Sequence, residues 1–239
     1  MTVFFIGAGP GDPELITVKG QRLLRQCPVI LYAGSLVPEA VLAGHVAEEV
    51  VDTADLDLEQ IIERLAAADA RGQDVARVHS GDPSLFGAIG EQIRALQARG
   101  IAWEIIPGVT AASASAAALG CELTLPGISQ TVILTRHARK TTMPAGESLP
   151  ELARHGATLA IHLAIRHQDE IVAILQPEYG AYCPVAVVYR SSWPDQRLVR
   201  CRLDDIVARV AEAPVERTAL ILVGQVLSSA DFARSTLYA

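Results

Sequence analysis

VFFIGAGPGDP, residues 3–13, is the stretch that decides how the chain begins to fold. Residues 3–7 are a short run of β-branched and aromatic side chains that ends in glycine, which is typical of a buried strand. Asp12 and Pro13 then predict the start of a helix, because aspartate caps free N–H groups and proline suits the first helical position. A strand, a glycine-rich turn and a helix in this order indicate an α/β protein.

The same alternation continues to about residue 120. The hydrophobic pattern predicts further strands at 28–33, 74–80 and 101–106, and helices at 12–25, 58–65, 86–96 and 110–119. Strands that alternate with helices predict a mostly parallel sheet with helices on both faces. We therefore expect an N-terminal α/β domain at 1–121.

The alternation of strands and helices is interrupted at residues 122–130, and a second set of strands and helices follows. Strands are predicted at 131–135, 158–163, 184–189, 197–202 and 218–224, with helices at 168–175 and 203–212. The third and fourth of these strands are joined by a turn that contains Trp193 and Pro194, so they predict a hairpin. Because a hairpin is antiparallel, the C-terminal domain at 122–239 is expected to hold a mixed sheet. The predicted architecture is two α/β domains that meet in a cleft.

The composition excludes several classes of protein. The net charge of −7 argues against a general nucleic-acid binder, which normally carries a basic surplus. The four cysteines lie far apart with no C-x-x-C pair, so we expect reduced structural thiols. No stretch approaches the roughly 20 apolar residues that span a bilayer. These features predict a soluble, cytoplasmic protein with no membrane or nucleic-acid partner.

The glycine-rich turn at 7–12 lies at the end of the first strand, where open α/β sheets bind ligands. It departs from the dinucleotide pattern G-x-G-x-x-G, because Asp12 occupies the third glycine position and would repel a pyrophosphate at the helix start. Two interpretations of Asp12 remain open. It caps the helix, or it contacts the substrate as part of a loop that a ligand approaches closely.

A second turn, SGDPSLFG at 80–87, follows the third strand. Gly81 lets the backbone come close to a ligand, and Asp82 offers a carboxylate to an ammonium group or to ribose hydroxyls. The alternative is that Asp82 only caps the next helix. Thr110, in a third turn with the sequence PGVTA at 107–111, admits the same two interpretations.

Together, GAGPGDPELIT at 7–17, GDPSLFG at 81–87 and PGVTA at 107–111 resemble the tetrapyrrole methyltransferase family in order and spacing. Within it, the stretches at 32–37, 122–136, 143–147 and 187–193 resemble the precorrin-4 C11-methyltransferases of cobalamin synthesis. The resemblance implies a homodimer that binds S-adenosylmethionine in its interdomain cleft and leaves S-adenosylhomocysteine as product. It also implies that an acidic tetrapyrrole, precorrin-4, is methylated at C-11 to give precorrin-5.

The resemblance further implies which residues contact the cofactor. They are Pro10, Ser80, Gly81, Asp82, Leu85, Thr110 and Ala111 in the N-terminal domain, and Leu163, Tyr189, Arg190 and Ser191 in the C-terminal domain. Family members that act on uroporphyrinogen III carry an aspartate after the second strand, proposed as a proton acceptor. Residues 32–36 (YAGSL) have no counterpart to it, so the catalytic base of this chain stays unassigned.

A substrate with several carboxylates needs basic partners. Arg136, His137, Arg139 and Lys140 form a basic stretch, and together with Asp12 they are the candidate substrate residues. Arginine suits this role because its guanidinium matches a carboxylate in bidentate fashion. The alternative is that the stretch is a solvated surface loop.

The histidines allow two further predictions, on metal binding and on proton transfer. His162 and His167 are five residues apart, a poor spacing for metal ligands, so no protein-bound metal is predicted. His79 is either a proton carrier near neutral pH or a packed residue at the end of a strand.

Other functions stay open beside the leading one. One is the same methylation of a cobalt-loaded ring, and another is methylation of a different tetrapyrrole. Diphthine synthase belongs to the same superfamily, but the basic stretch at 136–140 counts against it. From a different class, a non-catalytic tetrapyrrole-binding module would need the substrate residues but no cofactor pocket.

Overall fold

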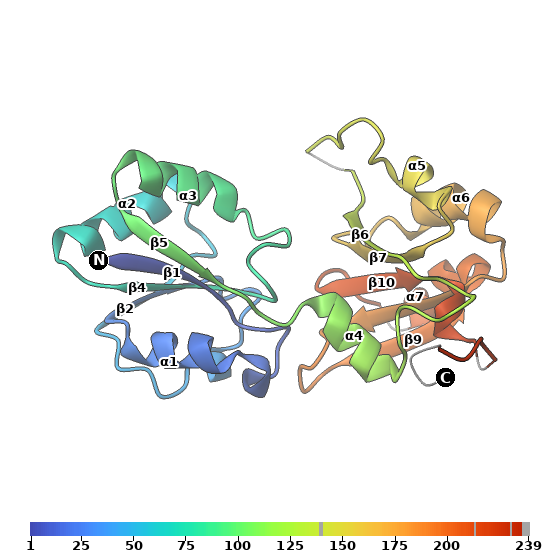
Figure 1. The fold of residues 1–239 in the computed structure, drawn as a ribbon, viewed down its shortest axis with the longest axis horizontal. Helices are drawn as coiled ribbons and strands as arrows, with labels where there is room; N and C mark the ends of the chain where they lie inside the picture. Colours follow the sequence, from blue (N-terminus) through green and yellow to red (C-terminus); the bar gives the residue numbers. More distant parts are fainter. Residues whose placement is uncertain (139–140, 213, 230, 236–239) are drawn as a thin grey trace. The chain divides into compact units, whose positions relative to one another are not determined.

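The computed structural model describes residues 1–138, 141–212, 214–229 and 231–235, which form two compact units (Figure 1). The first unit consists of Met1–Ala111 together with Ser192–Pro194. The second consists of Ala112–Ser191 and the described residues from Asp195 onwards. Among the described residues, no helix is long and apolar enough to cross a bilayer.

The first unit is built on a parallel sheet of five strands in the order β3-β2-β4-β1-β5. The strands are β1 (Thr2–Gly7), β2 (Val29–Tyr32), β3 (Glu49–Asp52), β4 (Val75–His79) and β5 (Ala102–Ile106). The helices are α1 (Val18–Gln26), α2 (Leu58–Ala70) and α3 (Ile89–Ala98), with 3-10 turns at Pro13–Leu15 and Glu39–Leu42. The predicted parallel sheet is thus confirmed.

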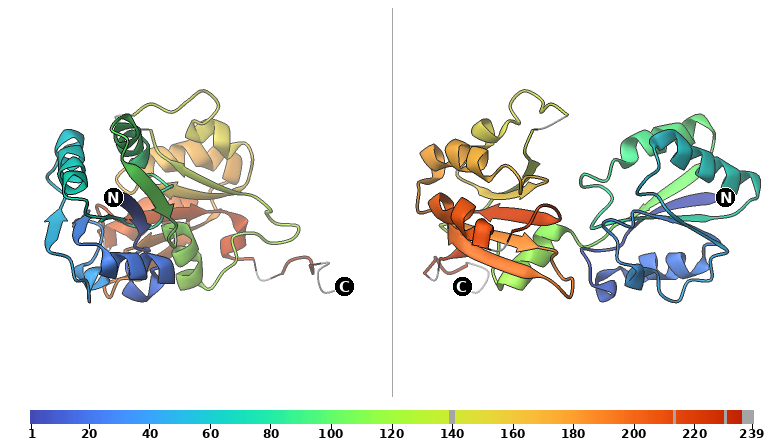
Figure 2. Two further views of the ribbon diagram at one scale, coloured as in Figure 1. Left: turned by 60° about the vertical axis from the view of Figure 1, so that its left-hand side comes forward. Right: turned by 180° about the vertical axis from the view of Figure 1, so that it is seen from behind.

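Both faces of this sheet are covered, because successive strand residues point to opposite sides. Phe5 and Leu31 pack with Leu65 of α2 on one face. Ile6 and Leu24 of α1 belong to the core of the other face. Helix α1 therefore lies on one side of the sheet and α2 and α3 on the other (Figures 1 and 2).

One local prediction needs correction, and one strand was not predicted. The helix expected at 12–25 is divided, because α1 starts only after Thr17, whose hydroxyl accepts the N–H of Gly20 at 3.1 Å. Strand β3 had no strong signal in the sequence, since its four residues carry charges at both ends and it forms the edge of the sheet. Charges on edge strands hinder pairing with other chains, but they also hide the apolar pattern of a strand.

The second unit holds a mixed sheet in the order β6-β7-β10-β8-β9, as predicted. The strands are β6 (Val132–Arg136), β7 (Thr158–His162), β8 (Pro184–Tyr189), β9 (Arg197–Arg202) and β10 (Ala219–Val223). The helices are α4 (Ala111–Leu119), α5 (Leu149–Ala153), α6 (Gln168–Tyr179) and α7 (Ile206–Glu212), and 3-10 turns lie at Leu203–Asp205 and Gln225–Leu227. β8 and β9 pair antiparallel, which confirms the hairpin.

Helix α4 covers one face of the mixed sheet. Ala112 and Leu119 pack with Ala160, Ala186 and Leu222, and α5, α6 and α7 pack on the opposite face. The division at 121 would assign α4 to the N-terminal domain, whereas its buried side chains join the core of the second unit. Alanine-rich helices give a weak amphipathic pattern, so the sequence alone does not indicate which sheet such a helix covers.

Candidate functional site

The loops that follow β1 and β4 leave the sheet in opposite directions. β1 is hydrogen-bonded to β4 on one side and to β5 on the other. The chain continues from β1 to α1 on one face and from β4 to α3 on the other. In open α/β sheets, ligands commonly bind at the carboxyl ends of neighbouring strands whose connections diverge in this way.

The backbones of these strand-end loops are in direct contact. Gly81 donates its N–H to the carbonyl oxygen of Gly9 at 2.7 Å, and Gly9 donates back at 3.2 Å. A Cβ on Gly7 would lie 2.6 Å from the Cα of Gly108 and 2.7 Å from the carbonyl oxygen of Gly81. No side chain fits between these backbones. Three of the predicted motifs therefore meet at one edge of the sheet.

Asp82 holds two of the loops together. Its Oδ2 accepts the N–H of Gly108 at 2.9 Å, and its Oδ1 accepts the N–H of Ser84 at 2.8 Å and the Ser84 hydroxyl. Burial raises the pKa of this carboxyl, but the hydrogen bonds outweigh it and hold the pKa below the ordinary value. Because α3 begins at Ile89 after Ala88, the interpretation of Asp82 as a cap of that helix is wrong.

Pro10 and Gly11 lie against an aromatic ring that the sequence did not single out. The indole Nε1–H of Trp193 donates to the carbonyl oxygen of Pro10 at 2.8 Å. A Cβ on Gly11 would lie 2.9 Å from the Cγ of that ring and closer still to its five-membered edge. Trp193 is 183 residues away from Pro10, so no spacing in the sequence indicates this contact.

Two candidate substrate residues form hydrogen bonds within the protein. Asp12 accepts the N–H of Glu14 at 2.9 Å and donates its own N–H to the hydroxyl of Ser192 at 2.9 Å, so its role as a cap is confirmed. His137 is buried, with its Nε2 2.8 Å from a carboxylate oxygen of Glu170. Their contacts to a substrate stay predictions.

His79, next to the second loop, is a packed residue. It is 6% exposed, and its ring lies beside that of Phe5 with 5.9 Å between centroids. Burial, assisted by the charge of Arg77, lowers the pKa of His79 to about 3, so the ring is neutral near pH 7. Arg77 is itself buried and donates to Gln92 of α3 at 3.2 Å. The packed interpretation of His79 is the one that the structure supports.

The remaining predicted residues of the first unit lie on the same loops. Leu85 is half-buried and donates its N–H to the carbonyl oxygen of Asp82 at 3.2 Å. Ser80 directly follows β4 and is half-buried. Thr110 lies between the Gly108 turn and α4, and Ala111 is the first residue of that helix. Their contacts to a cofactor stay predictions.

Four predicted cofactor residues belong to the second unit. Leu163 directly follows β7, is 62% exposed and has a φ of +56°. Arg190 follows β8 with a φ of +44°, and its guanidinium forms an ion pair with Asp195 at 2.8 Å and lies 5.6 Å from the ring centre of Tyr189. Ser191 is buried. Left-handed backbone at such bulky residues is strained and is commonly retained at functional positions.

The basic stretch is described only in part. The guanidinium of Arg136 donates to the carbonyl oxygens of Thr141 at 3.1 Å and Thr142 at 3.3 Å. Arg136, the last residue of β6, therefore donates to the backbone of the loop that follows this strand. Arg139 and Lys140, the other basic candidates, lie outside the described residues.

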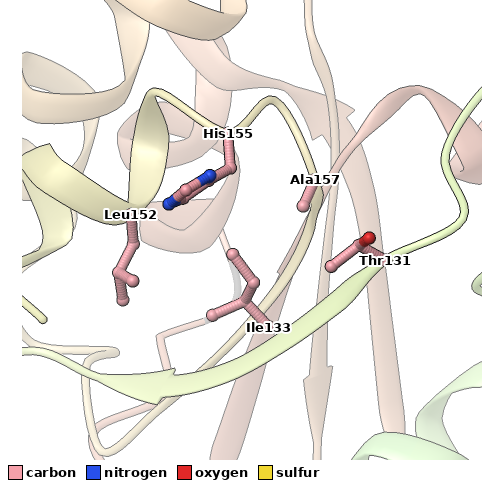
Figure 3. Close-up of a pocket in the computed structure, with 5 residues that line it drawn as sticks. All are labelled: Thr131, Ile133, Leu152, His155 and Ala157. Carbon is pink, nitrogen blue, oxygen red and sulfur yellow. The ribbon is translucent and has the colours of Figure 1, made fainter.

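A pocket of about 350 Å³ lies elsewhere in the second unit (Figure 3). Its lining consists of Thr131, Ile133, Leu152, His155 and Ala157. None of the predicted cofactor or substrate residues contributes to it. We therefore place the candidate functional site at the strand-end loops rather than in this hollow.

Comparison with known proteins identifies the family of the chain. The model of the family described as Tetrapyrrole (Corrin/Porphyrin) Methylases matches residues 2–207. The chain is 69% identical over 238 residues to the precorrin-4 C(11)-methyltransferase of Pseudomonas aeruginosa. The match covers 100% of this chain and 95% of that relative.

Solved structures give the same result. The X-ray structure of a cobalt precorrin-4 methyltransferase, a cobalamin biosynthetic enzyme, matches with a TM-score of 0.92 and 40% identity, over 95% of this chain and 96% of that one. A uroporphyrin-III C-methyl transferase from Thermus thermophilus, complexed with S-adenyl homocysteine, matches with a TM-score of 0.78 and 32% identity, over 95% and 99%.

Proposed function

We propose that the chain, which belongs to the tetrapyrrole (corrin/porphyrin) methylase family, transfers a methyl group to C-11 of precorrin-4 and so forms precorrin-5 in cobalamin synthesis. The observation that carries this proposal is the 69% identity to a precorrin-4 C(11)-methyltransferase along the whole chain. Both units are included in that similarity, so it extends beyond the loops of the first unit.

The methyl donor that we propose is S-adenosylmethionine. A related enzyme is described in complex with S-adenyl homocysteine, the demethylated form of this cofactor. The turns at 7–11, 80–85 and 107–111 contain no lysine or arginine, and they offer backbone groups, hydroxyls and the Asp82 carboxylate. Such a donor set suits a ligand with a positive sulfonium and a positive ammonium group, and it is unsuited to a pyrophosphate.

The residues of the first unit have a positioning role in this proposal. Bound S-adenosylmethionine supplies a methyl group on a sulfonium, which is electrophilic without further activation. The chain must then align the acceptor carbon and keep water out, and preorganised loops favour both. Asp82 fixes the second loop to the third, and Trp193 holds the Pro10 turn. Both contacts position loops, and neither involves a nucleophilic side chain.

The proton acceptor stays unassigned. His79 is the histidine next to the second loop, but burial lowers its pKa to about 3, so the ring is too weak a base to hold a proton near pH 7. We propose Arg136 and the basic stretch that follows it as the region that binds the substrate carboxylates. The charge of Arg136 and its position at the end of β6 support that proposal.

The test is incubation of the protein with S-adenosylmethionine and either metal-free or cobalt-loaded precorrin-4, followed by NMR location of the new methyl group. A methyl group at C-11 of the metal-free ring is the expected product. A methyl group at another carbon would overturn the assignment of position. Calorimetry with S-adenosylmethionine accompanies it, and no heat at micromolar to millimolar concentration would favour a non-catalytic binding module.

A second candidate is the methylation of cobalt-precorrin-4. It is favoured by the TM-score of 0.92 with an enzyme of that name. The same incubation distinguishes the two, because a product formed only from the cobalt-loaded ring would select this candidate. Activity on both rings would show that the site does not distinguish the metal.

We also propose that the chain acts as a homodimer. The edge strand β6 exposes Leu134 by 38% and the edge strand β9 exposes Leu198 by 40%, and such side chains are suited to contacts between copies. Light scattering coupled to gel filtration measures the mass directly. A mass of one chain at micromolar concentration would contradict the dimer.

A further inference from the structure

A cluster of three side chains in the second unit lies apart from the loops described above. His137 directly follows β6, His167 directly precedes α6, and Glu170 lies in the first turn of that helix. The Nε2 of His137 is 2.8 Å from one carboxylate oxygen of Glu170, and the Nδ1 of His167 is 3.1 Å from the other. Two imidazole rings therefore face one carboxylate.

The surrounding fold fixes these side chains. Ile171 and Leu175 of α6 are fully buried in the core, which anchors the first turns of the helix. The rings of His137 and His167 pack against each other with 5.1 Å between centroids. The side chains of His137 and His167 are 11% and 24% exposed, and that of Glu170 is 60% exposed. The cluster is thus rigid on its inner side and open to solvent at the carboxylate.

The ligand chemistry of the cluster is that of a transition-metal site. One ligand atom from each residue can be chosen so that all three lie within 4.8 Å of one another. Zinc bonds to imidazole nitrogen and carboxylate oxygen at about 2.0–2.2 Å, which places tetrahedral ligand atoms about 3.4 Å apart. The two nitrogen–oxygen distances, 2.8 and 3.1 Å to different carboxylate oxygens, are shorter than that by about 0.6 and 0.3 Å. The Glu170 side chain is exposed and has room to move outward.

The orientation of the three groups suits a cation as well. Each carboxylate oxygen of Glu170 faces one ring nitrogen, Nε2 of His137 or Nδ1 of His167. The Nε2 of His167 is buried and has no hydrogen-bond partner among the described residues, which leaves Nδ1 as its coordinating atom. A neutral imidazole needs only to move its proton to the other nitrogen to offer a lone pair.

We propose that His137, His167 and Glu170 bind one first-row divalent cation, of which Zn²⁺ is the representative. Two imidazoles and one carboxylate are a common set of protein ligands for such ions, and the remaining positions face solvent. Water or the carboxylate of an acidic ligand occupies them. His137 also belongs to the basic stretch that we propose for the substrate carboxylates, but binding of the cation is measured with neither methyl donor nor methyl acceptor present, so the two proposals are tested separately.

This site differs from the expectation that the chain binds no metal. That expectation considered the spacing of His162 and His167 along the chain. The fold instead brings the rings of His137 and His167, which are 30 residues apart in the sequence, into contact. Of the three residues, only His167 and Glu170 have a regular helical spacing, i and i+3.

The test uses untagged full-length protein that has been treated with a chelator and dialysed. Calorimetry with Zn²⁺ is expected to show one saturable site per chain, and Co²⁺ is expected to give visible d–d absorption bands. His137→Ala and Glu170→Gln are expected to weaken Zn²⁺ binding at least about tenfold, since removing even a supporting group of a metal site has an effect of that size.

The matched control is His155→Ala, which removes an exposed histidine of the same unit (Figure 3). It is expected to bind Zn²⁺ like the wild type. Glu170→Gln replaces an exposed side chain by one of equal size, and circular dichroism with thermal unfolding verifies that it folds. The absence of a saturable site, or equal affinity in wild type, His137→Ala and Glu170→Gln, would overturn the proposal.

Discussion

The indole nitrogen of Trp193 lies 2.8 Å from the carbonyl oxygen of Pro10 and donates a hydrogen bond to it, while the ring covers the backbone of Gly11. The turn that opens the fold is therefore fixed by a residue 183 positions further along the chain. Glycine at position 11 is required for this contact, because any side chain there would occupy the place of the ring.

The first prediction concerns that glycine. Gly11→Ala is expected to displace the Trp193 ring and to lower the free energy of unfolding by about 1–3 kcal/mol, as is usual for overpacking. Chemical unfolding measures the loss. The control is Gly90→Ala in α3, where an added Cβ meets nothing within 4 Å. Alanine has the higher helix propensity, so the control is expected to be neutral or stabilising by up to about 1 kcal/mol. Equal effects of both changes would contradict the packing of Trp193 on Gly11.

The second prediction separates the ring from its hydrogen bond. Trp193→Phe retains an aromatic cover but leaves the carbonyl oxygen of Pro10 without the indole donor, at an expected cost of about 0.5–1.5 kcal/mol. The control is Trp103→Phe in the same unit, because the Trp103 indole makes no hydrogen bond within the described part of the chain. Unfolding midpoints that fall equally in both variants would show that the hydrogen bond contributes nothing.

The third prediction concerns Asp82. Asp82→Ala frees the N–H groups of Gly108 and Ser84, and it is expected to weaken binding of S-adenosylhomocysteine by about 1–3 kcal/mol. Asp82→Asn keeps one acceptor oxygen and is expected to lie in between. Calorimetry measures the affinities, with the exposed Asp55→Ala of the same unit as the control. An affinity unchanged in Asp82→Ala would remove Asp82 from the cofactor site.

The fourth prediction concerns pH and His79. Its folded pKa is about 3, lowered mainly by burial, whereas an unfolded histidine takes up a proton near pH 6.5. The unfolded state therefore binds more protons between these values, and stability falls as the pH drops below about 6.5. The contribution of this residue is at most about 1.4 kcal/mol per pH unit. The variant His79→Gln lacks this titrating group. The difference in unfolding free energy between the variant and the wild type is therefore expected to change between pH 7.5 and pH 5. A difference that stays constant over that range would show that His79 protonates in the folded protein.

The fifth prediction concerns the substrate residues. Arg136→Ala is expected to raise the KM for the tetrapyrrole and to leave the affinity for S-adenosylhomocysteine unchanged, because a carboxylate partner is lost. Arg136→Lys keeps the charge without the bidentate fork and is expected to be intermediate. The control is Arg22→Ala, an exposed arginine of α1 in the first unit. A loss of cofactor affinity without a change in KM would show that Arg136 is misplaced.

The sequence by itself determined the alternation of strands and helices, the hairpin of β8 and β9, and the three glycine-containing turns at strand ends. These features depend on the spacing of apolar residues and on glycine and proline, which act over a few neighbouring positions. The family also follows from the motifs, since they occur in order along the chain. Short charged elements such as β3 were missed for the same reason, because their local pattern is weak.

Only the tertiary structure decided which groups meet. Asp82 follows β4 and Gly108 follows β5, and both strands are parallel neighbours of β1, so the two loops leave the sheet at the same edge and meet there. Trp193 reaches Pro10 across 183 residues, and His137 reaches Glu170 across 33. Such contacts depend on strand order and on core packing, neither of which has a periodic signal in the sequence. The sequence could therefore indicate the loops of the site, whereas the fold decided how their side chains are used.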